Sequence, residues 1–396
     1  MIQIIPIFSL YVHVPFCAAK CGYCAFYSIP LQNSSALAES YLAALRREAK
    51  ILRAAWGGKI PVRTIYIGGG TPTVLSPLLW RALIKTITDF FDLSNLEEAT
   101  VEANPCSLSE PHLALWRGSF VTRVSIGVQS LDDDELRWLG RLHNAKTALR
   151  SIEKTMSYGF AVSADLIFAL PRQTLRAWRD TCAQILSSGV EHVSAYQLTI
   201  EPDTPLGGLS GDERGGAPDG YSFYRFAQWY MNRKGLAQYE ISSFAKPGLE
   251  CAHNLAYWRQ ENVLALGPSA WGYINRSADG FRYRNAKTLE EYITLTELGI
   301  PIVDAEILSG QKRDEESAIL ALRTKWGVDF KNFEKKFEKK FEKEDGFAAR
   351  LENVLKNIPS HLVRFESDHA GNIERARLTP SGMRVGNAIW SEIVGE

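Results

Sequence analysis

Short runs of β-branched residues alternate with longer amphipathic segments through the first half of the chain, and this alternation limits the folds it can adopt. The runs predict strands at residues 9–14, 63–67, 100–103, 123–128, 162–168 and 192–198. The segments with apolar residues at helical spacing are 39–55, 77–91, 132–158 and 174–187. Strand–helix units in series require parallel strands joined by right-handed crossovers. The sequence therefore predicts an α/β fold, a partial, open (β/α)6 barrel of the TIM type.

Beyond residue 200 the pattern changes. Residues 203–220 are rich in Gly, Pro and acidic residues, which is typical of an exposed loop or a lid. A helix is expected at 221–234 and a strand at 238–244. We expect three parts: a barrel domain, a connecting segment and a small, mostly helical C-terminal domain, at 1–240, 241–303 and 304–396.

The C-terminal part contains a stretch rich in Lys and Glu with phenylalanines at helical spacing, namely Phe330, Phe333, Phe337 and Phe341. The spacing predicts a surface helix that docks one aromatic face into a small core. A membrane or nucleic-acid helix is the less favoured interpretation. The repetition of FEKK is local and indicates no repeat architecture.

Three thiols, Cys17, Cys21 and Cys24, lie within eight residues directly after the first predicted strand. Three thiolates can bind three irons of a four-iron cluster and leave the fourth iron open to a small molecule. A structural zinc site would need a fourth ligand. The nearest candidate is His13, which lies on an apolar run and is more typical of a packed histidine. The spacing therefore favours an open cluster over zinc.

The other three cysteines are scattered without paired spacing, at Cys106, Cys182 and Cys251. This arrangement disfavours a four-thiolate electron carrier, and disulfides are disfavoured because no secretory signal is recognisable. The first ten residues lack a basic start and a cleavage site, and no apolar run is long enough to cross a bilayer. We expect a cytoplasmic protein, since free thiols survive in a reducing compartment.

The charge balance gives no reason to expect a nucleic-acid partner. Lys and Arg together number 45, and so do Asp and Glu. Proteins that bind nucleic acid usually carry an excess of basic residues on one surface.

Polar residues and glycines fall repeatedly at the predicted strand ends. Residues 68–71 (GGGT) follow the second strand, Glu102 ends the third, Gln129 follows the fourth and Asp165 lies within the fifth. Each alone is more often a cap, a salt bridge, a solvated side chain or a tight turn, and the glycine run lacks the lysine of a P-loop. The carboxyl ends of barrel strands converge on one mouth. The repeated occurrence of polar residues and glycines at these ends therefore predicts a shared site.

Several motifs resemble those of radical S-adenosylmethionine (SAM) enzymes, specifically the coproporphyrinogen-oxidase-like group. The strongest are YVHVPFCAAKCGYCAFYS at 11–28, IGGGTPT at 67–73, VEANP at 101–105 and SIGVQSLDDDELRWLGRLHNA at 125–145. The similarity continues through YEISSFAKPG at 239–248 and HNLAYW at 253–258 to LTPSG at 378–382. It covers nearly the whole chain.

The resemblance implies a cofactor set and roles for particular residues. Cys17, Cys21 and Cys24 would ligate a [4Fe–4S] cluster whose fourth iron SAM chelates, and a flavodoxin- or ferredoxin-type donor would supply the electron that cleaves SAM. The implied SAM contacts are Gly69, Gly70 and Thr71 at the methionine end, and Glu102, Gln129, Arg141 and Asp165 around one or two SAM molecules. Tyr11 and Tyr23 match positions that flank the cluster and its ligand.

Two branches of the group differ in function. The oxidase branch decarboxylates porphyrinogen propionates, and it has a longer N-terminus and a further cysteine two positions after the third. Here that position is Phe26, and only sixteen residues precede Cys17. These departures favour the heme-chaperone branch, which transfers heme to client hemoproteins. Membrane respiratory enzymes are candidate clients, and a homodimer is a candidate assembly.

The motif HNLAYW agrees with the chaperone branch, which carries an HNxxYW motif associated with heme. His253 is the implied axial ligand and Cys251 a lower-ranked thiolate alternative. From the residues alone, a histidine near aromatics is more often a packed core residue. A third reading, a zinc- or cluster-stabilised binding module, predicts no SAM binding. Arg172 also departs from the group, which usually has glycine at that turn.

Overall fold

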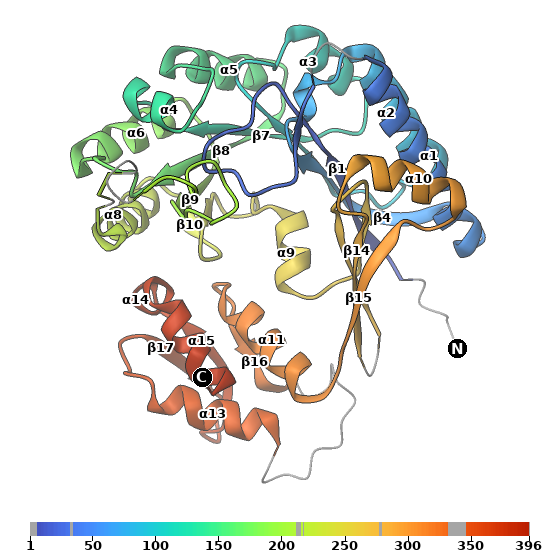
Figure 1. Ribbon diagram of the computed structural model, residues 1–396. Coiled ribbons are helices and arrows are strands. Elements are labelled where there is room, and N and C mark those ends of the chain that lie inside the picture. The colour runs from blue at the N-terminus through green and yellow to red at the C-terminus, as the bar shows by residue number, and fades with distance from the viewer. Residues whose placement is uncertain are drawn as a thin grey trace.

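One large mixed sheet forms the body of the protein in the computed structural model, which describes residues 6–31, 35–210, 215–216, 218–276, 279–331 and 346–395. Six strands of the barrel follow one another along the chain: β1 (Phe8–Val14), β4 (Ile60–Gly69), β6 (Glu98–Ala103), β7 (Arg123–Gln129), β8 (Ala161–Phe168) and β9 (His192–Gln197). Each pairs in parallel with the next. The arc of strands in Figure 1 is therefore the predicted α/β arrangement.

Helices cover the outer face of this arc (Figure 1). They are α1 (Ser35–Trp56), α2 (Pro77–Phe90), α3 (Glu110–Arg117), α4 (Asp133–Trp138), α5 (Ala145–Ser157), α6 (Leu175–Ser187) and α8 (Gly220–Arg233). The main core lies between helices and strands, and Trp80, Trp116 and Trp178 are fully buried there. This layer supplies most of the apolar burial that stabilises the barrel.

The single helix predicted at 132–158 is two helices. The chain leaves α4 through Gly140, whose φ of 75° is left-handed, and re-enters helix at Asn144, whose side chain accepts a hydrogen bond from the Thr147 amide. Glycine adopts such a φ without strain, and asparagine is a favoured N-cap. The break places Arg141 between the two helices.

The sheet continues past both ends of the arc. Beyond β1 come β12 (Val263–Leu266), β13 (Trp271–Asn275), β14 (Gly280–Asn285) and β15 (Ile302–Leu308), and beyond β9 come β11 (Ser243–Ala245) and β10 (Ala237–Gln238). The predicted strand 238–244 is thus an antiparallel pair of short strands. Across the part of the chain that the structure describes, the strand order runs from β10 to β15 without a pairing that joins these edges. The barrel is open, as predicted.

The remaining short elements of this body connect these layers. They are β2 (Phe16–Cys17), β3 (Ile29–Pro30), β5 (Phe91–Asp92), the 3-10 helix Pro72–Val74, α9 (Ala252–Trp258) and α10 (Leu289–Leu298). Of these, α9 lies between the arc and the C-terminal part (Figure 1).

The C-terminal part has its own core, which includes Leu322, Leu351 and Ala376. Its helices are α11 (Gly310–Leu322), α13 (Phe347–Asn357), α14 (Pro380–Arg384) and α15 (Gly386–Val394). They accompany a three-stranded antiparallel sheet of β16 (Val328–Asp329), β18 (Ile373–Leu378) and β17 (Val363–Ser367), which the sequence did not lead us to expect. In β17 and β18 charged residues interrupt the apolar ones, so neither has a strong strand signal.

The predicted phenylalanine helix lies mostly outside the described residues. Phe330 is buried in the C-terminal core, and Phe333, Phe337 and Phe341 belong to the stretch that the structure does not describe. None of the described helices combines the length and the apolar character needed to cross a bilayer.

Candidate cofactor site

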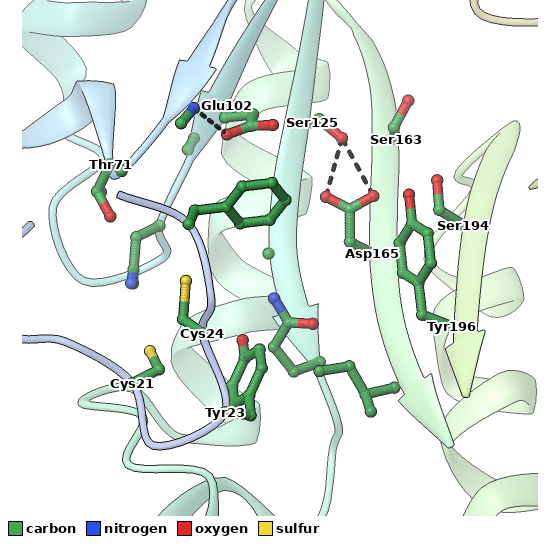
Figure 2. Close-up of a pocket in the computed structure, with 18 of the residues that line it drawn as sticks. Cys21, Tyr23, Cys24, Thr71, Glu102, Ser125, Ser163, Asp165, Ser194 and Tyr196 are labelled. Carbon is green, nitrogen blue, oxygen red and sulfur yellow. Dashed lines mark hydrogen bonds between the residues drawn. The ribbon is translucent and has the colours of Figure 1, made fainter. Parts of the chain in front are cut away.

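The cysteine loop lies at the rim of a cavity inside the arc (Figure 2). It runs between β2 and β3, which pair in parallel. The Thr71 hydroxyl donates a hydrogen bond to Cys17 Sγ at 3.4 Å, and Arg141 Nη1 donates to Cys21 Sγ at 3.4 Å. Cys24 completes the set on the same cavity wall. The cavity has a volume of about 420 Å³, within the usual range for a small-molecule site.

The three cysteines fit a cluster better than a single metal ion. They line one cavity, yet among the described residues no three His, Cys, Asp or Glu side chains converge on one point as zinc would require. The irons of a cluster are separate atoms, so their thiolate ligands need not converge. His13 is also occupied, because its Nε2 lies 2.9 Å from the Tyr27 carbonyl oxygen and its Nδ1 3.1 Å from Tyr11 Oη.

Without metal, the thiols of Cys17 and Cys24 favour their neutral form. Burial raises the pKa of Cys17 and of Cys24 above the ordinary value. Thiolate is the form that binds iron, so loading the site releases protons.

The glycine run brings the end of β4 against both the cysteine loop and Glu102. A Cβ on Gly68 would lie 2.6 Å from Glu102 Cδ, and one on Gly70 would lie 2.6 Å from the Phe16 carbonyl oxygen. Gly69 has a φ of 106° and donates its amide to Glu102 at 3.0 Å. Larger residues would push these layers apart, so this segment needs glycine for close approach.

Two carboxyl groups face the cavity from different strands (Figure 2). Glu102 accepts hydrogen bonds from the Tyr66 hydroxyl at 2.9 Å and from the Gly69 amide, and Asp165 accepts from the Ser125 hydroxyl at 3.0 and 3.2 Å. Burial, together with the nearby charge of Asp165, raises the pKa of Glu102 to about 7. Burial raises the pKa of Asp165 to about 6. A cationic ligand would favour the ionised form of both groups.

Gln129 and Arg141 approach the same cavity. The pairing of β7 with β8 shifts register between Gly127 and Gln129, and Gln129 has a left-handed φ of 68°. Such irregularities re-aim side chains at strand ends. Arg141 Nη2 donates to the Gly127 carbonyl oxygen at 2.7 Å, while Nη1 contacts Cys21. Arg141 thus joins β7 to the cysteine loop.

The tyrosines expected to flank the cluster differ in position. Tyr23 lines the cavity, and Tyr11 lies behind the wall, where its ring stacks on Tyr66 with centroids 6.3 Å apart. Sequence reasoning did not single out several other lining residues: Tyr66, Asn104, Ser125, Ser163, Ser194 and Tyr196. Strand alternation could have found four of them, because Tyr66, Ser125, Ser163 and Ser194 lie on inward-facing positions of their strands.

The residues of HNLAYW lie below the cavity on α9. His253 is only 1% exposed, its ring stacks on Tyr66 with centroids 5.2 Å apart, and its Nδ1 lies 2.9 Å from Thr64 Oγ1. Burial lowers the pKa of His253 to about 3, so the ring is neutral. Asn254 and Cys251 line the cavity floor, and Cys251 Sγ donates to Glu98 at 3.3 Å. Tyr66 therefore separates His253 from the cysteine-lined space.

Comparison with known proteins first identifies the broad class of protein to which this chain belongs. The profile of the Radical SAM superfamily matches residues 11–185. The fold matches the solved structure of coproporphyrinogen III oxidase (HemN) from Escherichia coli with a TM-score of 0.82, over 98% of this chain and 90% of that chain, at 21% identity. The fold and the superfamily match together define a radical SAM protein.

The particular family follows from curated relatives of similar length. The heme chaperone HemW of Bacillus subtilis is 36% identical, and the match covers 98% of this chain and 99% of that protein. HemW of Lactococcus lactis is 32% identical, with 98% and 97% covered. HemW of Mycobacterium tuberculosis is 33% identical, with 81% and 83% covered. The chain belongs to the HemW family of radical SAM proteins.

Proposed function

We propose that this protein is a heme chaperone that holds a [4Fe–4S] cluster and SAM in the barrel cavity, binds heme and delivers it to client hemoproteins. The observation that carries the proposal is the near full-length similarity to proteins named heme chaperones. The cysteine-lined cavity supports the cluster and SAM, since its size and its two carboxyl groups suit a ligand with ammonium and sulfonium charges. We also propose a cytoplasmic location and a flavodoxin- or ferredoxin-type electron donor.

The chain's own residues would divide the work at this site. Cys17, Cys21 and Cys24 would hold the cluster, which supplies an open iron and an electron when it is bound. Glu102 and Asp165 would balance the positive charges of SAM. Arg141 would orient the cysteine loop and neutralise thiolate charge near Cys21.

For heme, we propose that His253 supplies the axial ligand through Nε2. The Thr64 hydroxyl donates to Ser9 Oγ at 2.8 Å, so its oxygen is left to accept the proton of His253 Nδ1. Nε2 then carries the lone pair, and it has no hydrogen-bond partner within the described structure. A neutral imidazole oriented through its other nitrogen is the form that binds metals. Because the ring is buried, heme must enter with a displacement of α9 from β4.

The second candidate function is the oxidase, and the similarity to the HemN fold favours it. Phe26 stands where the oxidase branch has a further cysteine, and its side chain is 67% exposed on the cavity rim. Decarboxylation requires a propionate carbon to lie within near-contact distance of the reactive group, and small misplacement is costly. We therefore expect heme binding without conversion of coproporphyrinogen III.

Anaerobic reconstitution followed by heme titration tests the proposal. Wild-type protein should bind heme near stoichiometrically, and His253→Ala should change the heme absorption spectrum while cluster iron and sulfide stay normal. His112→Ala is a matched control, because His112 is also buried but has both ring nitrogens hydrogen-bonded, to Ser109 and Leu75. Cys251→Ala tests the thiolate alternative.

A parallel assay supplies reductant, SAM and coproporphyrinogen III. Multiple-turnover decarboxylation would overturn the chaperone proposal in favour of the oxidase. An unchanged spectrum in His253→Ala would instead reject only the proposed axial ligand.

A further inference from the structure

Strand β4 touches both the cofactor cavity and the proposed heme ligand. Thr64 and Tyr66 are two residues apart and therefore lie on the same face of the strand. Tyr66 lines the cavity and donates its hydroxyl to Glu102 at 2.9 Å, and the same ring stacks on His253 at an interplanar angle of 30°. Thr64 holds the other side of the imidazole through Nδ1.

The neighbouring strand β6 repeats this arrangement. Glu102 faces the cavity, and Glu98, four residues earlier on the same face, accepts hydrogen bonds from the His253 amide and from Cys251 Sγ, both at 3.3 Å. Arg123 holds Glu98 in a buried ion pair at 3.1 Å. Strands β4 and β6 pair in parallel, so the two contacts to His253 share one rigid frame.

Within this frame Tyr66 is a direct side-chain link between the cavity and the imidazole. Thr64 and Glu98 are almost fully buried and do not line the cavity, whereas Tyr66 contacts both sides. A cationic ligand beside Glu102 would draw that carboxyl into its ionised form, and a carboxylate accepts a shorter and stronger hydrogen bond than a neutral acid. Any resulting movement of the Tyr66 hydroxyl moves a ring that is in contact with His253.

We propose that Tyr66 is a positioning residue that couples occupancy of the cofactor cavity by SAM to the environment of the His253 imidazole. The proposal rests on the proposed function, in that the cavity takes SAM and His253 meets heme. It gives a physical route by which a cluster and SAM, housed at the barrel mouth, can influence heme held at the other side of Tyr66.

The primary test reads the imidazole without heme. The chain has seven histidines, so side-chain nitrogen resonances of cluster-loaded protein labelled with 15N-histidine can be assigned by single substitutions. In the wild type, added SAM should shift the His253 resonances. In Tyr66→Phe, which keeps the ring but loses the hydroxyl, SAM should still bind, within about tenfold of the wild-type affinity because one hydrogen bond is lost, and the shift should disappear.

Tyr196→Phe is the matched control, because Tyr196 also lines the cavity, whereas the cavity-lining ring that stacks on His253 in the described structure is that of Tyr66. It should retain the SAM-induced shift. Saturating SAM that leaves His253 unshifted in the wild type would overturn the inference, and so would an intact shift in Tyr66→Phe.

A second readout separates this inference from the proposed function. The heme absorption spectrum of wild-type protein should change on addition of SAM, and that change should be lost in Tyr66→Phe. If the wild type binds no heme but shows the SAM-dependent shift, the chaperone proposal fails and the coupling stands.

Discussion

The two faces of the barrel strands differ sharply although they belong to the same strands. On β8 the outward Val162, Ala164 and Leu166 are buried in the main core, and the inward Ser163 and Asp165 line the cavity. Barrel interiors of this type are usually filled by bulky branched side chains. Here small hydroxyl residues stand inside the arc, at Thr100, Ser125, Ser163 and Ser194. The barrel therefore gives up interior packing to make room for ligand.

The inward face also carries unfavourable features. Gln129 has a left-handed backbone, and Glu102 and Asp165 have raised pKa values. Strain and buried charge of this kind persist at functional sites because the surrounding structure supports them. The comparison teaches that stability resides in the outer layer and ligand binding in the inner one.

The largest expected effect comes from a truncation in the outer layer. Trp178 is fully buried on α6, packs on Phe168 at 5.6 Å and donates Nε1 to the Phe223 carbonyl oxygen at 3.0 Å. Trp178→Ala should lower the free energy of unfolding by about 3–5 kcal/mol through the cavity it leaves. Ser125→Ala on the inner face should cost about 1 kcal/mol or less and weaken SAM binding. Chemical denaturation and SAM binding assays measure both.

A stability loss in Ser125→Ala as large as that in Trp178→Ala would break the comparison. So would normal SAM affinity in Ser125→Ala, because that hydroxyl donates to both oxygens of Asp165.

The next effect is a pH dependence of protein stability. It comes from a buried carboxyl group that lies outside the cavity, in contrast to Glu102 and Asp165. Glu48 on α1 accepts hydrogen bonds from the Gly267 amide at 3.0 Å, from Asn285 at 2.6 Å and from the Tyr292 hydroxyl. Burial raises its pKa from 4.5 to about 7. Its stabilising contribution is therefore full below about pH 4.5 and lost as the pH rises through about 7.

Replacing this carboxyl by an amide should remove that dependence. The stability of Glu48→Gln relative to wild type should rise between pH 4.5 and pH 8 by on the order of 3 kcal/mol, at about 1.4 kcal/mol for each unit of pKa. Denaturation across this pH range measures it, with the exposed Glu153→Gln as control. SAM should not change this pH-dependent stability difference. A difference that changes with SAM would contradict the division between an outer layer for stability and an inner one for ligand binding.

The smallest effect concerns backbone strain beside the barrel mouth. Arg172, in the turn after β8, has a left-handed φ of 64° and an exposed side chain. Arg172→Gly should stabilise the protein by about 1 kcal/mol because glycine adopts this conformation without strain. Arg176→Gly, in the right-handed first turn of α6, is the matched control and should destabilise by about 1 kcal/mol. Thermal unfolding measures the change in stability of each variant. Changes of the same sign in the two variants would contradict the explanation.

Much of the barrel could be predicted because its periodicity is strong and its elements are long. The break between α4 and α5 could not, since apolar spacing continues across it and only Gly140 and Asn144 mark the turn. The small sheet of the C-terminal part was missed because β16 has only two residues and the other two strands, β17 and β18, carry alternating charges. Whether a short segment forms a strand depends on the strand it pairs with, and the sequence of the segment does not reveal that partner.

The site residues also divide into those that could be predicted from the sequence and those that could not. The residues that share one cavity with the three cysteines are Gly69, Thr71, Glu102, Gln129, Arg141 and Asp165. The position of all but Arg141 in or just after a predicted strand made their convergence predictable, and Arg141 was implied by the resemblance alone. Tyr66 was missed because an inward tyrosine on a buried strand has no distinctive motif. The burial of His253 behind that ring depends on how α9 packs under β4, and spacing within HNLAYW does not encode it.

Strand β1 lies between β4 and β12, and both pairings are parallel. A ribosome releases β1 and the cysteine loop before α9 and β12, so β1 remains an edge strand on that side until β12 emerges. Exposed apolar edges pair readily with other chains. A fragment that ends before Cys251 would keep that edge open and would also lack Cys251 and Asn254, which line the cavity. A cofactor that loads onto the nascent chain would therefore meet an incomplete site until α9 had emerged.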